Sequence, residues 1–266
     1  MSQNLRVRVF SGIVIGAITI LAGLLGGIWW GAFLLGLAVR ATDEMIALVT
    51  AGGFRPGRPA ALLVAAGVFL ALWLRLPIAA VGVGVSVLMF GTLATQLRRR
   101  DGTVTADWAL TLISGGYVGW CAGHLALLRD SPNGLGWVII AIGATWLADS
   151  AAYLVGSRFG RRKLAPSVSP KKTWEGYVGG ILAALLGGVL FGFVVPEIGP
   201  VKSILLAIAA GALGTLGDLS ESMFKRQAHA KDSGDLIPGH GGVFDRMDSV
   251  LWTGVVVYYG SVLLGQ

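Results

Sequence analysis

The sequence predicts an all-α integral membrane protein, a polytopic bundle of about nine transmembrane helices. Three observations predict this class. Hydrophobic residues make up 55% of the 266 residues, and glycine alone contributes 41 of them. The mean hydropathy is +0.74, more than a soluble domain of this length can hide in a core. Apolar runs of about 17–25 residues, the length that a bilayer core requires, recur along the chain.

The apolar runs place the membrane spans in order along the chain. The first run follows Arg6 and Arg8 and predicts an uncleaved helix rather than a signal peptide, because a second apolar run follows at once. That second run is short, and we expect the segment 41–59 after it to lie at the membrane interface. The expected spans are residues 9–25, 28–40, 60–75, 77–96, 108–128, 134–156, 176–195, 201–218 and 249–265.

Charge asymmetry between the loops predicts the orientation. Alternate loops are rich in Lys and Arg, as at Arg98, Arg99 and Arg100, whereas the loops between them carry few. The positive-inside rule then puts the N-terminus and every basic loop in the cytoplasm and the C-terminus outside. The net charge of +7 is therefore a topology signal and not a nucleic-acid footprint.

Small residues and the lack of repeats bear on organisation. Glycines spaced by four, such as Gly188 and Gly192, let helix backbones approach and also allow a homodimer. No internal repeat or low-complexity linker interrupts the chain, so we expect one domain over residues 1–266. Within it, we expect N-terminal helices over 1–128 and catalytic helices with cytoplasmic loops over 134–266.

The first segment that carries chemistry begins at Asp149, well inside an expected span. A carboxylate at that depth is usually functional, and the alternative is a structural pair with a neighbouring Arg. A basic stretch follows, directly before a helix expected to begin near Trp174. Side chains there could hold phosphate beside the helix N-terminus, or the lysines could only mark topology. The candidates are Ser169, Lys171, Lys172 and Thr173.

The second segment, residues 222–248, crowds cations, carboxylates and a glycine-rich turn between two apolar runs. Asp218 ends the eighth span, while Asp245 and Asp248 lie three residues apart where the ninth helix starts. Together these carboxylates predict an oxygen cage for Mg²⁺, which binds through one or two carboxylates plus substrate phosphates. Helix capping is the alternative for Asp245 or Asp248 alone. We expect His240 to contact substrate rather than act as a base.

Other catalytic machinery is missing from the sequence. No GxxxxGK[ST] run is present, because Gly156 to Arg162 fails that pattern. No Cys/His cluster offers a zinc site, and the single cysteine, Cys121, excludes an intramolecular disulfide framework. His229 and His240 lie too far from a serine partner in the sequence to indicate a hydrolase triad.

These motifs resemble those of the phosphatidate cytidylyltransferases, or CDP-diacylglycerol synthases. The resemblance is specific between residues 149 and 248, and before that it rests on hydrophobic layout alone. It rests on Asp149-x-x-Ala152-Tyr153, Ser169 through Gly176, Ser222-x-x-Lys225-Arg226, Lys231-Asp232, Pro238-x-His240-Gly241-Gly242 and Asp245-Arg246-x-Asp248.

The resemblance implies transfer of a cytidylyl group from CTP to phosphatidic acid, giving CDP-diacylglycerol and pyrophosphate for phospholipid biosynthesis. The lipid phosphate is the nucleophile and is already ionised, so catalysis reduces to alignment and charge neutralisation. We expect the active site to face the cytoplasm at the cytoplasmic membrane, with a lateral opening for the lipid. Mg²⁺ is the expected cofactor, and a second cation is implied by the resemblance.

The resemblance and the residue chemistry together assign roles at this site. The expected metal ligands are Asp149, Asp218, Asp245 and Asp248. The expected catalytic residues are Asp149, Asp218, Lys225, Arg226 and Asp245. The expected substrate-binding residues are Ser169, Lys171, Lys172, Thr173, Ser222, Lys231, Asp232, His240, Gly241, Gly242 and Arg246.

Two alternatives stay open on the sequence. The same motifs would serve a CTP-dependent transferase that acts on another lipid phosphate, such as an isoprenoid phosphate or an ether lipid. A secondary transporter of an anionic solute, with Asp149 as its ion site, belongs to a different class. Charges gathered at one membrane face and the lack of a repeat argue against the transporter.

Overall fold

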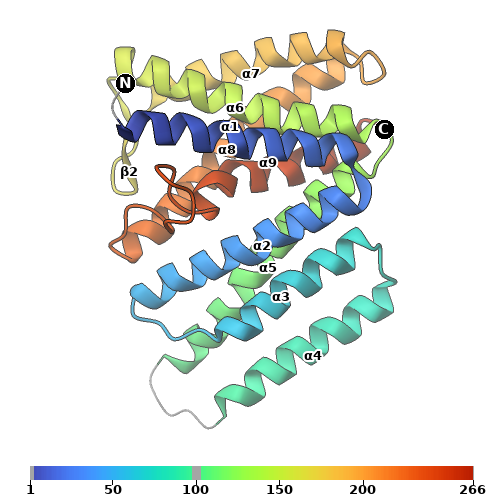
Figure 1. Cartoon of the computed structure of the whole chain (residues 1–266), viewed down its shortest axis with the longest axis vertical. Coiled ribbons are helices and arrows are strands. Elements are labelled where there is room, and N and C mark those ends of the chain that lie inside the picture. Colours follow the sequence, from blue (N-terminus) through green and yellow to red (C-terminus); the bar gives the residue numbers. More distant parts are fainter. Residues whose placement is uncertain (1–2, 98–102, 266) are drawn as a thin grey trace. The chain divides into compact units, whose positions relative to one another are not determined.

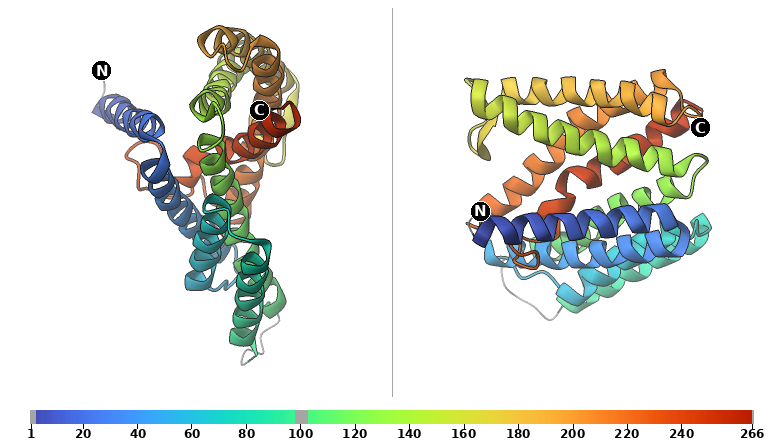
Figure 2. Two further views of the ribbon diagram at one scale, coloured as in Figure 1. Left: turned by 90° about the vertical axis from the view of Figure 1, so that its right-hand side faces the viewer. Right: turned by 45° about the horizontal axis from the view of Figure 1, so that its top comes forward.

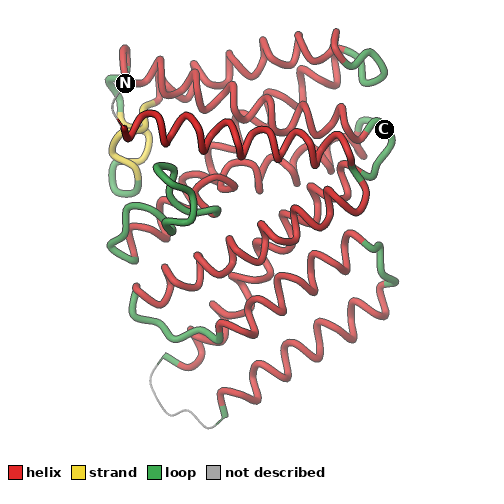
Figure 3. Tube along the Cα trace, viewed as in Figure 1, coloured by secondary structure: helices red, strands yellow, loops and turns green. Residues whose placement is uncertain are grey.

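The computed structural model describes residues 3–97 and 103–265, which form nine helices and one β-hairpin (Figures 1 and 3). Each expected span corresponds to one helix, so the all-α membrane class is confirmed, while Arg98, Arg99 and Arg100 fall outside the described residues. The elements are α1 Gln3–Leu25, α2 Gly27–Ala51, α3 Arg58–Trp73, α4 Ile78–Gln96, α5 Val104–Arg129, α6 Gly134–Phe159, β1 Lys163–Ala165, β2 Ser169–Thr173, α7 Trp174–Val194, α8 Pro200–Gln227 and α9 Phe244–Leu263.

Two helices extend beyond the runs that the sequence predicted. Helix α2 continues through half of the segment expected at the interface, because Ala41, Met45 and Leu48 keep an apolar face buried there. Helix α8 continues past Asp218 to Gln227. Hydropathy marks where the apolar run ends, whereas the backbone hydrogen bonds of a helix continue through polar residues.

Four helices of the described residues are long and apolar enough to cross a membrane: α4, α6, α7 and α8. Shorter apolar helical segments occur at Phe10–Leu25 and Arg58–Trp73. With its hydrophobic composition, the protein is an integral membrane protein. The expected count of nine crossings and the sides on which the termini lie stay predictions.

The chain folds as two compact units that interleave along the sequence. Unit 1 comprises Met1–Ala22, Ile28–Ala126 and Phe224–Asp245, and unit 2 comprises Gly23–Gly27, Leu127–Met223 and Arg246–Gln266. The division expected near residue 128 thus lies beside a unit boundary, although a later segment returns to unit 1. A single domain over residues 1–266 stays a prediction.

Close backbone approach shapes unit 1. The α5 residues Gly115 and Gly119 lie so close to α3 that a Cβ atom would come within 2.2 Å of the Ala61 oxygen and 2.4 Å of the Ala65 oxygen. The buried Trp30 of α2 donates its indole N–H to the Leu125 oxygen of α5 over 3.1 Å. Helices α2, α3 and α5 are therefore held together through backbone contacts as well as apolar packing.

Glycines also allow close backbone approach in unit 2. Helices α6 and α7 lie side by side there (Figures 1 and 2), and glycines of α7 lie against α8. A Cβ atom at Gly188 would lie 2.7 Å from the Ile204 Cα atom, and one at Gly192 would lie 2.5 Å from the Pro200 Cα atom. The close approach that the sequence predicted for this glycine pair is confirmed, and α8 is the helix that it admits.

A feature that the sequence did not predict is the antiparallel hairpin of β1 and β2, drawn yellow in Figure 3. Strand β2 leads directly into α7, so the helix start expected near Trp174 is confirmed. The Thr173 hydroxyl caps α7 by accepting the Gly176 N–H over 3.2 Å, and Glu175 accepts N–H groups from Arg161 and Arg162. The hairpin thereby fixes the backbone that carries the side chains of Lys171 and Lys172, directly before α7.

Candidate active site

Unit 2 contains a three-carboxylate cluster made by Asp218, Glu221 and Asp248. One carboxylate oxygen from each residue lies within 4.8 Å of the other two. Asp218 and Glu221 are three residues apart on α8, so they share a helix face. Gly217 lets α9 come close, because a Cβ atom there would lie 2.4 Å from the Asp248 backbone oxygen. The cluster thus depends on a glycine at the α8–α9 crossing.

Two described side chains contact Asp218 in this cluster. Lys172 Nζ lies 2.7 Å from Asp218 Oδ2, and the Ser222 hydroxyl donates to Asp218 Oδ1 over 3.4 Å. Glu221 is only 1% exposed, and one of its carboxylate oxygens lies within 4.8 Å of a carboxylate oxygen of Asp218. Three carboxylates thus lie close enough to repel one another, an arrangement that a bound cation relieves.

Two further predicted residues act on the cluster electrostatically. Asp149, exposed on α6, repels Asp218 and Asp248, while Arg246, exposed on α9, attracts the carboxylates of Asp149 and Asp248. All donor groups of the three-carboxylate cluster are oxygens, the donor type that hard divalent cations such as Mg²⁺ prefer. The residues present therefore fit the predicted cofactor.

Unit 1 contains a different carboxylate arrangement, centred on Asp245 at the start of α9. Lys225 Nζ lies 2.7 Å from Asp245 Oδ1. The backbone N–H groups of Ser233 and Gly242 both donate to Asp245 Oδ2 over 2.8 Å. The residue is 7% exposed, so these partners replace water almost completely. Asp245 is held as an anchor for the loop that precedes α9.

The second carboxylate of unit 1 comes from Glu44 on α2, which the sequence analysis did not assign to the site. Glu44 is 2% exposed and accepts the Phe244 N–H over 2.9 Å. The Ser233 hydroxyl lies 2.9 Å from Glu44 Oε2 and also 2.9 Å from Asp245 Oδ2, so it bridges the two acids. Arg40 Nε pairs with Glu44 Oε1 over 3.2 Å. We call Glu44, Ser233, Asp245 and Lys225 the loop anchor.

The glycine-rich turn wraps around the loop anchor. Gly241 has a φ of +81°, and a Cβ atom there would lie 2.5 Å from Asp245 Oδ2. A Cβ atom at Gly242 would lie 2.1 Å from Glu44 Oε2. The sequence predicted that these glycines admit a ligand. The structure gives them an additional reason, since their backbones lie against carboxylates of the protein itself.

The remaining predicted residues lie at the edges of these two arrangements. His240 Nδ1 lies 2.9 Å from the hydroxyl of Ser11 on α1. The exposed Arg226 reaches the Ala230 oxygen over 3.3 Å. Ser169 is half-buried at the start of β2, and Thr173 is buried at its end. Three further residues, Lys171, Lys231 and Asp232, are exposed.

Asp248 and Asp218 share one cluster in unit 2, while the described partners of Asp245 are Lys225, Ser233 and Gly242 of unit 1. The metal-ligand roles expected for these acids stay predictions. The sequence analysis did not assign Glu221, Glu44 or Ser233 to the site. For Glu221, the shared helix face with Asp218 was a usable signal, and for Glu44 the only local signal was Arg40 one turn earlier. Nothing local marked Ser233.

Comparison with known proteins now identifies the family. The sequence model of the cytidylyltransferase family matches residues 6–264. The phosphatidate cytidylyltransferase of Brucella suis biovar 1 is 35% identical over 266 residues, covering 98% of this chain and 94% of that protein. The enzyme of the same name from Haemophilus influenzae is 47% identical over 127 residues, covering 46% of this chain and 44% of that protein. The resemblance read from the motifs is confirmed, and this chain belongs to the cytidylyltransferase family.

Proposed function

We propose that the protein transfers a cytidylyl group from CTP to phosphatidic acid, forming CDP-diacylglycerol and pyrophosphate for phospholipid biosynthesis. Membership of the cytidylyltransferase family over nearly the whole chain and the name of its relatives support this reaction. The observation that carries it is the three-carboxylate cluster with Lys172 beside it, a site suited to a nucleoside triphosphate and its cation.

The reaction makes modest chemical demands. A phosphate oxygen of phosphatidic acid attacks the α-phosphorus of CTP, and the bond from that phosphorus to the β-bridging oxygen breaks. Pyrophosphate leaves with the electron pair. Because the attacking phosphate is already ionised, the protein needs no strong general base, and its residues align the two substrates and offset their charge.

Three carboxylates would hold the cation, namely Asp218, Glu221 and Asp248. When bound, Mg²⁺ offsets negative charge on the phosphates and on the departing pyrophosphate. Asp149 adds a fourth carboxylate nearby, which supports the second cation that the resemblance implies. Asp245 was also expected among the ligands. Its engagement with Lys225 and Ser233 leads us to propose that it positions the loop instead.

Basic side chains would bind phosphate groups. Lys172 is paired with Asp218, and this places an ammonium group beside the cation site. Ser169, Ser222, Asp232 and His240 stay proposed polar contacts to substrate, with Gly241 and Gly242 shaping the turn beside them. The phosphate-binding residues that we propose are Lys171, Lys172, Arg226, Lys231 and Arg246.

The cellular setting follows the same proposal. Nine transmembrane crossings with a cytoplasmic N-terminus and an external C-terminus would put the basic loops in the cytoplasm, where CTP is available. The enzyme would work in the cytoplasmic membrane with its active site facing the cytoplasm. A single domain over residues 1–266 and a homodimer are further parts of this proposal.

The test uses purified protein in detergent with CTP labelled at the α-phosphate, phosphatidic acid and Mg²⁺. We expect labelled CDP-diacylglycerol only when all three are present, loss of product with EDTA and recovery with added Mg²⁺. Bound CTP without transfer to phosphatidic acid would overturn the lipid assignment, and isoprenoid or ether-lipid phosphates would be tried next. Failure to bind CTP would overturn the reaction class and restore the transporter hypothesis.

A further inference from the structure

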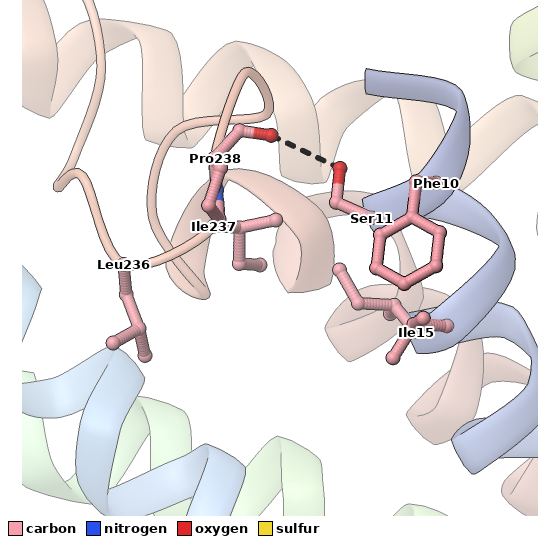
Figure 4. Close-up of a pocket in the computed structure, with 7 residues that line it drawn as sticks. Phe10, Ser11, Ile15, Leu236, Ile237 and Pro238 are labelled. Carbon is pink, nitrogen blue, oxygen red and sulfur yellow. Dashed lines mark hydrogen bonds between the residues drawn. The ribbon is translucent and has the colours of Figure 1, made fainter. Parts of the chain in front are cut away.

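An apolar pocket lies in unit 1 between α1 and the loop before α9 (Figure 4). Its volume is about 520 Å³, within the range typical of small-molecule sites. Of the seven described residues that line it, six are apolar, and the seventh is Ser11. The lining residues are Phe10, Ser11, Val14, Ile15, Leu236, Ile237 and Pro238.

The pocket wall and the glycine-rich turn are the same piece of chain. Ile237 N–H donates to the Gly241 oxygen over 2.9 Å, and His240 N–H donates to the Ile237 oxygen over 2.9 Å. These bonds close a tight turn. One part of the turn, Ile237 and Pro238, lines the pocket, while Gly241 lies against the loop anchor.

Ser11 contacts two residues of this turn, Pro238, which lines the pocket, and His240. Its hydroxyl donates to the Pro238 oxygen over 3.0 Å, as Figure 4 shows, and lies 2.9 Å from His240 Nδ1. With that hydroxyl proton engaged by the carbonyl, the Nδ1–H tautomer of His240 can donate to the Ser11 oxygen. The pocket therefore has an apolar interior and a histidine of the proposed substrate loop at its edge.

We propose that this pocket holds one fatty acyl chain of the phosphatidic acid substrate. The inference rests on the proposed function. His240 is a proposed substrate contact, and a lipid phosphate bound there would have its acyl chains attached within a few bonds, beside the apolar surface that such a chain can enter. Helix α1 supports access from the bilayer, because Phe10 and Ile13 are 70% and 65% exposed.

We expect the pocket to select acyl chains by their fit and not to gain affinity by removing them from water. An acyl chain that leaves the bilayer exchanges one apolar environment for another, so burial adds little affinity. A chain that no longer fits meets steric resistance. The expected signature is thus a change in preference among phosphatidic acids of different chain length, with little change for the shortest.

The experiment fills the pocket by Ile15→Trp and compares kcat/KM for dihexanoyl and dioleoyl phosphatidic acid in mixed micelles of constant composition. We expect the dioleoyl-to-dihexanoyl ratio to fall roughly tenfold. The matched control is Ile18→Trp on the same helix, outside the pocket lining, which should keep the wild-type ratio. An unchanged ratio in Ile15→Trp that still uses the dihexanoyl substrate would overturn the inference.

A second measurement avoids dependence on the variant. Wild-type protein is irradiated with phosphatidic acid that carries a diazirine near the end of one acyl chain, and the labelled peptides are identified by mass spectrometry. We expect label on residues 10–15 or 236–238, reduced by excess phosphatidic acid but not by phosphatidylcholine. Label elsewhere, or equal competition by both lipids, would overturn the inference. If the wild-type protein shows no cytidylyl transfer at all, the proposed function is overturned instead.

Discussion

Asp245 and Asp248 lie one turn apart on the same helix, yet hydrogen-bond donors surround the first carboxylate and other carboxylates lie beside the second. Asp245 receives two backbone N–H groups and a lysine ammonium. Asp248 faces the carboxylates of Asp218 and Glu221. The same residue type thus serves as the centre of an internally satisfied network in unit 1 and as part of a charge-rich cluster in unit 2.

The difference shows how a buried carboxylate can be used. A carboxylate surrounded by its own donors has its charge offset within the fold, and its loss leaves those donors unsatisfied. Carboxylates that face one another repel, and a bound cation relieves that repulsion. The loop anchor is therefore expected to control stability, and the three-carboxylate cluster to control turnover.

The largest expected effect comes from Asp218→Asn, which removes one charge from the three-carboxylate cluster. We expect kcat to fall by roughly 10²–10³-fold, because charge stabilisation of the transition state weakens. The unfolding midpoint in detergent should stay close to that of the wild type. Turnover at the wild-type rate over a range of Mg²⁺ concentrations would exclude Asp218 as a ligand.

Asp245→Asn should act on stability first. Breaking its pairing with Lys225 should lower the free energy of unfolding by about 3 kcal/mol. Denaturant titration in detergent measures the change, with Asp248→Asn as the matched control that should unfold like the wild type. If Asp245→Asn keeps wild-type stability but requires more Mg²⁺, then Asp245 is a metal ligand, as the sequence suggested.

Glu44→Gln tests whether α2 holds the glycine-rich turn. The substitution weakens the acceptor for the Phe244 N–H and the Ser233 hydroxyl, and we expect a loss of about 1–2 kcal/mol in stability. Limited proteolysis should show faster cleavage within residues 230–243. The control is Asp43→Asn, because Asp43 pairs with Arg40 and Arg58, whose side chains are 36% and 65% exposed. Equal cleavage in both variants would contradict the role of Glu44.

The smallest expected effect is that of Ser222→Ala. Its hydroxyl lies 3.4 Å from Asp218 Oδ1, a long hydrogen bond, so we expect kcat/KM to change by less than about threefold. Steady-state kinetics at saturating Mg²⁺ provide the measurement. A loss as large as that of Asp218→Asn would place the Ser222 hydroxyl on the substrate and extend the active site along α8.

The sequence alone predicted most of the helical architecture. Apolar runs of bilayer length are local features, so all nine expected spans coincide with helices of the described residues. The start of α7 was also predictable, because the cap at Thr173 lies within the motif that precedes it. Family membership followed from short motifs between residues 149 and 248, whose spacing the sequence displays directly.

Only the tertiary structure showed that Asp245 and Asp248 have different neighbours. Spacing places Asp245 and Asp248 on one helix face, but the groups that meet each carboxylate come from distant parts of the chain. Glu44 lies 200 residues before Phe244, whose N–H it accepts. Sequence patterns report which residues are apolar and which lie on one helix face. The charge that surrounds each acid depends on which elements pack together, and that was decided by the fold.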